Sequence, residues 1–177
     1  VTSFFNSTLD SPLCETGRRQ VADMRLILRS ARFWEGLSPK DLILHSSLQR
    51  AKDTLYGTLP HPSARHGMVI REMEDLREAT PYEHVDSRSL MRRVENFERT
   101  LMSKEYDKHH TLVVCGHSQY FKKMLKMKMR MNNVDVWEVA FNFDPSDRQH
   151  CVWGEPKLLH RTALAEVHPW DIFMGNA

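Results

Sequence analysis

The sequence predicts an α/β fold: a three-layer α/β/α sandwich in which helices cover both faces of a mostly parallel sheet. Short apolar runs of the length of buried strands alternate along the chain with segments whose apolar residues recur at helical spacing. A strand, a helix and a second strand in succession favour a parallel pair, because the helix returns the chain to the edge where it started. The 177 residues contain no repeat or low-complexity tract that would interrupt this order.

The first half of the chain supplies helices on either side of a strand. The first helix runs to about residue 31 and is predicted by three apolar residues at helical spacing: Val21, Met24 and Leu28. The apolar residues 42–44 predict a buried strand. A second helix is expected to begin near Leu48, with Ser46 or Ser47 as its N-cap.

The second half continues the alternation. Residues 68–70 predict a strand, and a helix follows from four apolar residues at helical spacing: Leu90, Val94, Phe97 and Leu101. The apolar run 111–115 predicts a third strand, again followed by a helix. Residues 134–143 alternate in part and predict one more strand, and residues 151–159 predict another.

Composition places the chain among ordinary globular domains. The hydrophobic content of 41% supports a buried core, and no run approaches the ~18 apolar residues that a membrane span requires. Three widely spaced cysteines do not suggest a disulfide framework and fit an intracellular, reducing compartment. No motif of a nucleic-acid-binding module is present.

The domain boundary is predicted near the end of the chain. We assign residues 1–160 to one domain, since the length fits a single core. Residues 161–177 are expected to form an irregular tail that docks on the domain or on a partner, because Trp170 and Phe173 favour burial.

The strand at residues 111–115 ends in Gly116-His117-Ser118, and this break is the clearest functional signal. A histidine at the carboxyl end of a parallel strand lies where open α/β folds bind their ligands. One interpretation makes Ser118 the nucleophile of an α/β-hydrolase elbow, G-x-S-x-G, although Tyr120 replaces the last glycine. The other makes His117 the functional group.

A second functional signal follows the strand at residues 42–44. Arg50 is expected in the first turn of the next helix, at the same edge of the sheet as His117. A guanidinium there can bind phosphate through two hydrogen bonds, and the free N–H groups of the helix N-terminus add to the positive field. The sequence therefore favours His117 and Arg50 as parts of a phosphate site.

Four segments in order resemble the motifs of the histidine phosphatase (phosphoglycerate mutase-like) superfamily. Residues 46–54 are similar to its S-x-L-x-R-A-x-x-T motif, and residues 10–21 to its D-x-P-L-T-x-x-G-x-x-Q-A element, with Cys14 in place of threonine. Residues 76–78 resemble its L-R-E element, and residues 113–118 the strand that carries its second histidine. The segment after Glu78 resembles the eukaryotic phosphatase-like branch more than the glycolytic mutases.

The resemblance implies a phosphoglycerate mutase-like fold and a set of roles. Arg50 and His117 would bind the phosphate, Asn6 would add a hydrogen bond, and Glu78 would protonate the leaving oxygen. All three of Arg50, Glu78 and His117 would be catalytic, and the chemistry would pass through a phosphohistidine without metal or other cofactor. The implied ligand is a phosphorylated small molecule or a phosphoprotein.

The nucleophile that the resemblance requires is not found at its expected place. In the family it is the histidine of an Arg-His-Gly motif that ends the first strand, yet no histidine precedes His45. Residues 3–6 fit the S-x-x-N that follows that motif, which puts the expected histidine immediately before Val1. Arg65-His66-Gly67 matches the three letters, but it follows a proline-broken loop instead of a strand, so we expect it to lie away from His117.

Three functional hypotheses follow. The first is a phosphomonoester hydrolase of the histidine phosphatase type, inactive as printed for lack of the nucleophile. The second is a pseudophosphatase that binds phosphate or serves as a subunit of a larger assembly. The third is the α/β-hydrolase with Ser118 as nucleophile, which predicts strained backbone at that residue.

Overall fold

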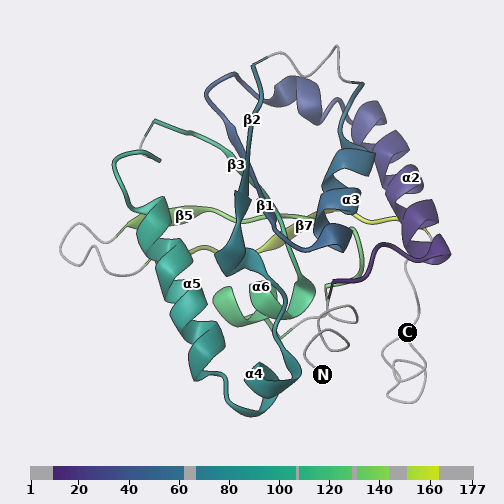
Figure 1. Ribbon diagram of the computed structural model, residues 1–177. Coiled ribbons are helices and arrows are strands. Elements are labelled where there is room, and N and C mark those ends of the chain that lie inside the picture. Colours follow the sequence, from purple (N-terminus) through teal and green to yellow (C-terminus); the bar gives the residue numbers. More distant parts are fainter. Residues whose placement is uncertain (1–9, 62–66, 107, 129–130, 144–150, 164–177) are drawn as a thin grey trace.

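The chain folds around a small parallel sheet (Figure 1). The computed structural model describes residues 10–61, 67–106, 108–128, 131–143 and 151–163. The sheet has the order β2-β1-β3 and consists of three strands: β1 (Leu42–Ser46), β2 (Val69–Met73) and β3 (Leu112–Cys115). Both pairings with β1 are parallel, so all three strands end at the same edge.

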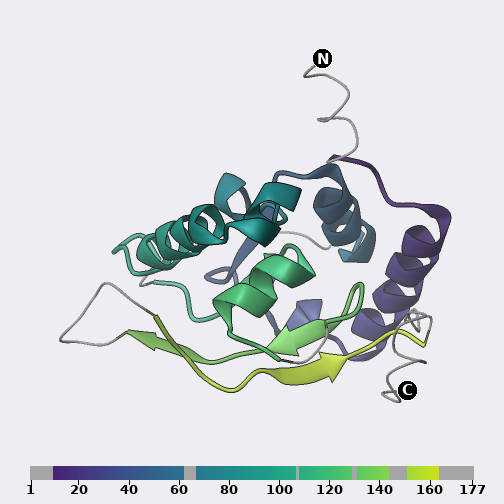
Figure 2. The same cartoon turned by 90° about the horizontal axis from the view of Figure 1, so that it is seen from below.

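Helices cover both faces of this sheet, as Figures 1 and 2 show from two directions. The described helices are α2 (Glu15–Ser30), α3 (Gln49–Thr58), α4 (Pro81–Val85), α5 (Arg88–Leu101) and α6 (Ser118–Met124), with short 3₁₀ turns η1 (Trp34–Gly36) and η3 (Glu74–Leu76). Helices α2 and α3 lie on one face, and α5 and α6 on the other. The predicted three-layer α/β/α arrangement is confirmed.

The central strand β1 separates two apolar clusters. All five of its residues are buried, and successive side chains point to opposite faces of the sheet. Ile43 packs with residues of α2 and α3, whereas Leu42 and Leu44 pack with residues of α5 and α6. The short apolar run seen in the sequence is therefore the centre of both cores.

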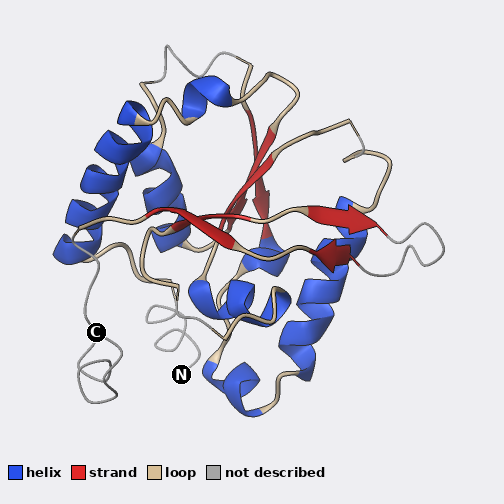
Figure 3. Cartoon of the chain, turned by 180° about the vertical axis from the view of Figure 1, so that it is seen from behind, coloured by secondary structure: helices blue, strands red, loops and turns tan. Residues whose placement is uncertain are grey.

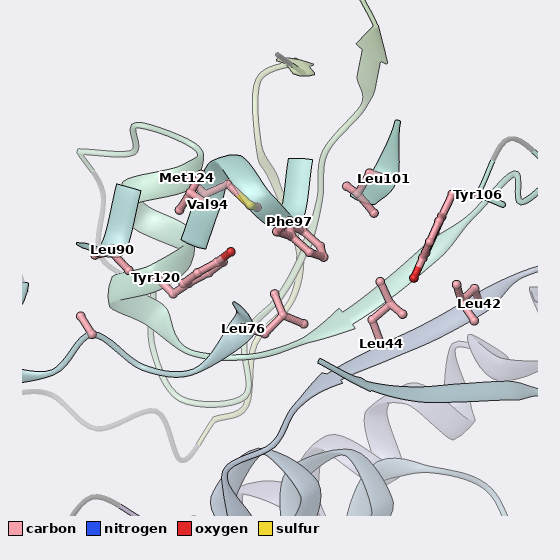
Figure 4. Close-up of a cluster of buried hydrophobic side chains, with 11 residues drawn as sticks. Leu42, Leu44, Leu76, Leu90, Val94, Phe97, Leu101, Tyr106, Tyr120 and Met124 are labelled. Carbon is pink, nitrogen blue, oxygen red and sulfur yellow. The ribbon is translucent and has the colours of Figure 1, made fainter. Parts of the chain in front are cut away.

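The cluster between the sheet and α5 is shown in Figure 4. The four residues predicted at helical spacing in this segment are all buried in α5: Leu90, Val94, Phe97 and Leu101. Phe97 meets Tyr120 of α6 edge to face, with ring centroids 6.5 Å apart. Because Tyr120 follows His117 by one helical turn, this packing fixes the helix that His117 precedes.

The last strands differ from the prediction. The strand expected at residues 134–143 is two short strands, β4 (Val136–Glu138) and β5 (Phe141–Phe143), and the one at residues 151–159 is β6 (Cys151–Trp153) and β7 (Lys157–His160). They pair antiparallel as β4-β7 and β5-β6, and run across the direction of the parallel sheet (Figure 3). Between the two pairs, Gly154 N donates to Ala140 O at 2.7 Å, so one continuous ribbon results.

The start of the predicted tail packs against the domain. The Thr162 hydroxyl donates to the Asp23 carboxylate of α2, and Arg161 pairs with Asp135 at 2.7 Å. Residues 164–177 of that tail lie outside the described residues. Within the described part of the chain, no helix has the length and apolar character to cross a membrane.

Helices α2 and α3 approach each other at Gly57 of α3. A Cβ atom at Gly57 would collide with Cγ1 of the buried Val21 in α2. Valine is stiff about its first side-chain torsion, so it cannot easily move aside. The close contact between the two helices therefore depends on the absence of a side chain at position 57.

We predict that Gly57→Ala destabilises the protein by about 1–2 kcal/mol, because overpacking outweighs the usual gain in helix propensity. Urea unfolding would show a lower midpoint at an unchanged slope. In a Val21→Ala background the same change should instead be stabilising, because the collision is gone. Gly36→Ala is the matched control, since no atom lies within 4 Å of a Cβ there. Stabilisation by Gly57→Ala in the wild-type background would contradict the packing described.

Candidate active site

The parallel strands bring three loops to one edge of the sheet. β1 ends at Ser46, β3 ends at Cys115 and leads to His117, and β2 ends at Met73 and leads through η3 to Glu78. In parallel strands the carboxyl ends lie together, which is why open α/β folds bind ligands there. The topology thus supports the predicted convergence of these segments.

His117 is held in a confined position. It is the N-cap residue of α6, has extended backbone angles and is 6% exposed. The preceding Gly116 permits this placement, because a Cβ there would lie 2.8 Å from the Phe121 ring. A larger residue at position 116 would therefore have to displace the partly exposed Phe121 ring.

Both ring nitrogens of His117 face polar groups. Nε2 lies 2.9 Å from the Ser46 hydroxyl oxygen, and Nδ1 lies 3.9 Å from Oε2 of Glu78. The Ser46 oxygen already accepts the Leu48 N–H at 3.2 Å, so its own proton can be donated to Nε2. The neutral ring then carries its proton on Nδ1, and we infer this tautomer because it directs the N–H toward the Glu78 carboxylate.

The imidazole of His117 is neutral at ordinary pH. Burial, followed by the positive charges of Arg50 and Arg93, lowers its pKa from 6.5 to about 3, against the opposing charge of Asp10. A buried neutral imidazole can donate one hydrogen bond without repelling the neighbouring guanidiniums. His117 therefore acts here as a hydrogen-bonding group in a positive field.

Arg50 is the second residue of α3, in its first turn as predicted. The N-cap prediction was wrong: Leu48 is the N-cap of α3 and makes no side-chain capping bond. The Asp10 carboxylate instead accepts the N–H of Gln49, from 39 residues away. This long-range cap brings a carboxylate to the helix N-terminus beside Arg50, and sequence proximity could not reveal it.

Glu78 lies at the same edge of the sheet and is partly exposed to solvent. Its side chain is 26% exposed, and Oε1 accepts the N–H of Ala79 at 3.0 Å. One carboxylate oxygen is thus held by backbone while the other faces His117. The structure therefore brings Glu78 and His117 together, with the charge of Arg50 acting on the same imidazole.

Arg93 of α5 is a further charged residue at the site, and the motifs did not identify it. Its charge lowers the pKa of His117 together with that of Arg50. Its side chain is only 15% exposed and hydrogen-bonds the backbone of the loop that carries Glu78. The available signal was its position in the sequence, between Leu90 and Val94 on the apolar face of the predicted helix, where a charged residue needs a partner.

Three other residues singled out in the sequence lie outside the described residues: Asn6, and Arg65 and His66 of the Arg-His-Gly segment. Of that segment only Gly67 is described, with a φ of 82°.

The α/β-hydrolase hypothesis requires strained backbone at Ser118, and the structure does not have it. Ser118 is the first residue of the regular helix α6. Among the described residues, a positive φ occurs outside glycine at three other positions: Arg32, Lys126 and Val134. The geometry therefore does not support Ser118 as an elbow nucleophile.

Within the described part of the chain, no group of three or more His, Cys, Asp or Glu side chains could hold a metal ion. Near His117, the Asp10 carboxylate accepts the Gln49 N–H and one Glu78 oxygen accepts the Ala79 N–H. The arrangement is suited to an anion that is held by hydrogen-bond donors and guanidinium charge.

Comparison with known proteins identifies the fold. No protein-family model and no curated protein sequence matches the chain. Among solved structures, a mycobacterial glucosyl-3-phosphoglycerate phosphatase is similar with a TM-score of 0.56 and 19% identity, over 88% of this chain and 90% of that one. A protein described as mycobacterial hydrolase 1 is similar with a TM-score of 0.51 and 18% identity, over 88% of each chain.

These likenesses establish the fold class. The chain has the phosphoglycerate mutase-like α/β fold of the phosphatase, with its parallel sheet and covering helices.

We predict that His117 makes stability dependent on pH. Because its folded pKa is about 3 and its usual value 6.5, the unfolded chain binds the extra proton first as pH falls. The free energy of unfolding should therefore be at its full value above pH 6.5 and fall toward pH 3, by up to about 1.4 kcal/mol per pH unit.

Urea unfolding at several pH values measures this slope. His117→Gln should remove about one proton from the pH dependence, whereas the exposed His110→Gln should leave it unchanged. Equal slopes in all three proteins would show that His117 is not held neutral by its surroundings.

Proposed function

We propose that this protein binds phosphomonoesters at the carboxyl edge of its parallel sheet and carries the phosphate-binding and proton-donating groups of a histidine-type phosphatase. One observation carries the proposal. A buried neutral His117 lies beside the Glu78 carboxylate, in the positive field of Arg50 and Arg93. Positive charge beside hydrogen-bond donors at this edge favours an oxyanion over a neutral ligand.

Arg50 and His117 are suited to binding the phosphate, and Glu78 is suited to donating a proton. Arg50 would bind two phosphate oxygens through its guanidinium, and Nδ1–H of His117 would bind a third. Glu78, in its protonated form, would donate to the leaving oxygen, since its Oε2 faces the same nitrogen. The predicted roles of these three residues are thereby mutually compatible in the structure.

The ligand is proposed to be a phosphorylated small molecule or a phosphoprotein. The similar mycobacterial phosphatase is named for glucosyl-3-phosphoglycerate, which is itself a phosphomonoester. The partly exposed Glu78 leaves the leaving-group side of the site open to solvent, so the same edge suits leaving groups of different size. Three free cysteines fit an intracellular, reducing compartment.

Catalysis through a phosphohistidine needs a second histidine in line with the phosphate. The described surroundings of His117 include a hydroxyl, two carboxylates and two guanidiniums, but no imidazole. His45, next to Ser46 in β1, has its ring on the other face, against Tyr56 at 5.9 Å. We therefore propose that Arg50, Glu78 and His117 suffice to bind phosphate, and that turnover at the rates of a phosphatase also needs such a second histidine.

The same observation favours a second function, that of a pseudophosphatase which binds a phosphorylated partner or serves as a subunit of an assembly. The phosphatase and pseudophosphatase proposals predict different effects of adding a strand that ends in Arg-His-Gly. If such a strand is joined before Val1 and hydrolysis of an aryl phosphate appears, the site is that of an enzyme. If binding persists without hydrolysis, the pseudophosphatase proposal is preferred.

We predict that Arg50→Ala weakens phosphate binding by roughly 10- to 100-fold, because charge-assisted hydrogen bonds contribute about 1.5–3 kcal/mol. Isothermal titration with inorganic phosphate measures this. Arg25→Ala, which removes an exposed arginine of α2, should bind like wild type. Equal losses in both variants would mean that phosphate responds to net charge and that the proposed site is wrong.

The accompanying assay is p-nitrophenyl phosphate hydrolysis by the printed chain, for which we expect no more than trace activity. Loss of a nucleophile costs several orders of magnitude in comparable enzymes. Rapid hydrolysis that His117→Ala abolishes would reveal a nucleophile other than the one proposed.

A further inference from the structure

We propose that Arg93 is a positioning residue that holds the Glu78 loop against His117, and that Glu83 holds Arg93 in place. This inference rests on the proposed function, because it explains how the proton donor of that site is kept in register with the phosphate ligand. Neither residue belongs to the motifs that indicated the site.

The guanidinium of Arg93 has five N–H donors, and each has an acceptor. Nε and Nη2 bind the two carboxylate oxygens of Glu83 at 3.3 and 2.9 Å. Nη1 binds the carbonyls of Asp75 and Arg77 at 3.0 and 2.7 Å, and Nη2 also reaches the carbonyl of Glu78 at 3.4 Å. The side chain of Arg93 thus hydrogen-bonds three of the four backbone carbonyls in residues 75–78.

These bonds meet a specific need of the loop. The segment between η3 and α4 is irregular backbone, and Arg93 gives the carbonyls of Asp75, Arg77 and Glu78 a common partner. Only a planar guanidinium can bridge a carboxylate on one side and several carbonyls on the other. The path of the loop, and with it the position of the Glu78 carboxylate, is therefore set by Arg93.

Glu83 is itself fixed. Its side chain is 5% exposed, and Oε2 accepts the Thr80 N–H at 2.8 Å in a capping box at the start of α4. Burial would raise the pKa of Glu83, but the hydrogen bonds from Arg93 and Thr80 outweigh it and the net pKa is lowered. The pair is thus a charged, buried anchor whose separation would leave an uncompensated charge.

Arg93 also contacts the helix that follows His117. Its guanidinium carbon lies 5.7 Å from the ring centroid of Tyr120, a residue of α6 with no exposed surface. The same side chain therefore touches the Glu78 loop and the helix capped by His117, and so fixes the 3.9 Å spacing between the two functional groups.

The test uses sulfate, a tetrahedral dianion whose charge stays constant between about pH 5 and 8. The charged groups that act on His117 are Arg50, Arg93 and Asp10. Glu78→Gln removes a carboxylate that faces His117, so sulfate should bind this variant roughly tenfold more tightly than the wild type at a fixed pH in that range.

Arg93→Lys keeps the positive charge but removes the planar guanidinium and its fixed set of N–H donors. We expect Glu78→Gln to tighten sulfate binding by a much smaller factor in an Arg93→Lys background than in the wild type, because the carboxylate is then no longer held beside His117. Arg92→Lys, at the exposed neighbouring position of α5, should behave like wild type. If Glu78→Gln tightens sulfate binding by the same factor in the wild-type and Arg93→Lys backgrounds, Arg93 has no positioning role.

Amide hydrogen exchange of residues 75–79 gives a readout that does not depend on binding. It should accelerate about tenfold or more in Arg93→Lys relative to Arg92→Lys while global unfolding stays cooperative. Unchanged exchange overturns the inference. Failure of the wild type to bind sulfate overturns the proposed function instead. If Arg93→Lys does not fold, Glu83→Gln, which frees Arg93 without removing it, is expected to accelerate the same amides.

Discussion

The parallel register of β1 with its two neighbours is the constraint on which the rest of the molecule depends. Leu42 to Ser46 is buried along its whole length and divides the apolar interior into two clusters. Because β2 and β3 pair with it in the same direction, the chain leaves all three strands at one edge. The contacts among Ser46, Glu78 and His117 follow from that geometry, and a change of register would separate them.

The electrostatic character of the site follows from burial. Burial keeps the imidazole of His117 neutral, so the positive field comes from arginines, which remain protonated at any ordinary pH. Asp10 and Glu83 offset part of this field: the Asp10 carboxylate lies at the N-terminus of α3, and Glu83 pairs with Arg93. An arriving phosphate would add negative charge beside His117 and favour its protonation, so anion binding and proton uptake are coupled.

Much of this arrangement could be predicted from the sequence, because it depends on local patterns. Arg50 and His117 each follow an apolar run of strand length, and strands separated by helices must end together. Other features depend on contacts between distant segments. The Asp10 cap of α3 and the Arg93 clamp on the Glu78 loop link residues that no periodicity connects. The break in the strand expected at residues 134–143 was likewise hidden, because partial alternation continues across it.

A crystal structure with bound tungstate, a tetrahedral oxyanion that scatters strongly, tests the central claim most directly. We expect one well-occupied tungstate within hydrogen-bond distance of His117 Nδ1 and the Arg50 guanidinium, with the Glu78 carboxylate facing a further oxygen. Tungstate bound elsewhere with this edge of the sheet left empty, at concentrations that saturate binding in solution, would contradict it.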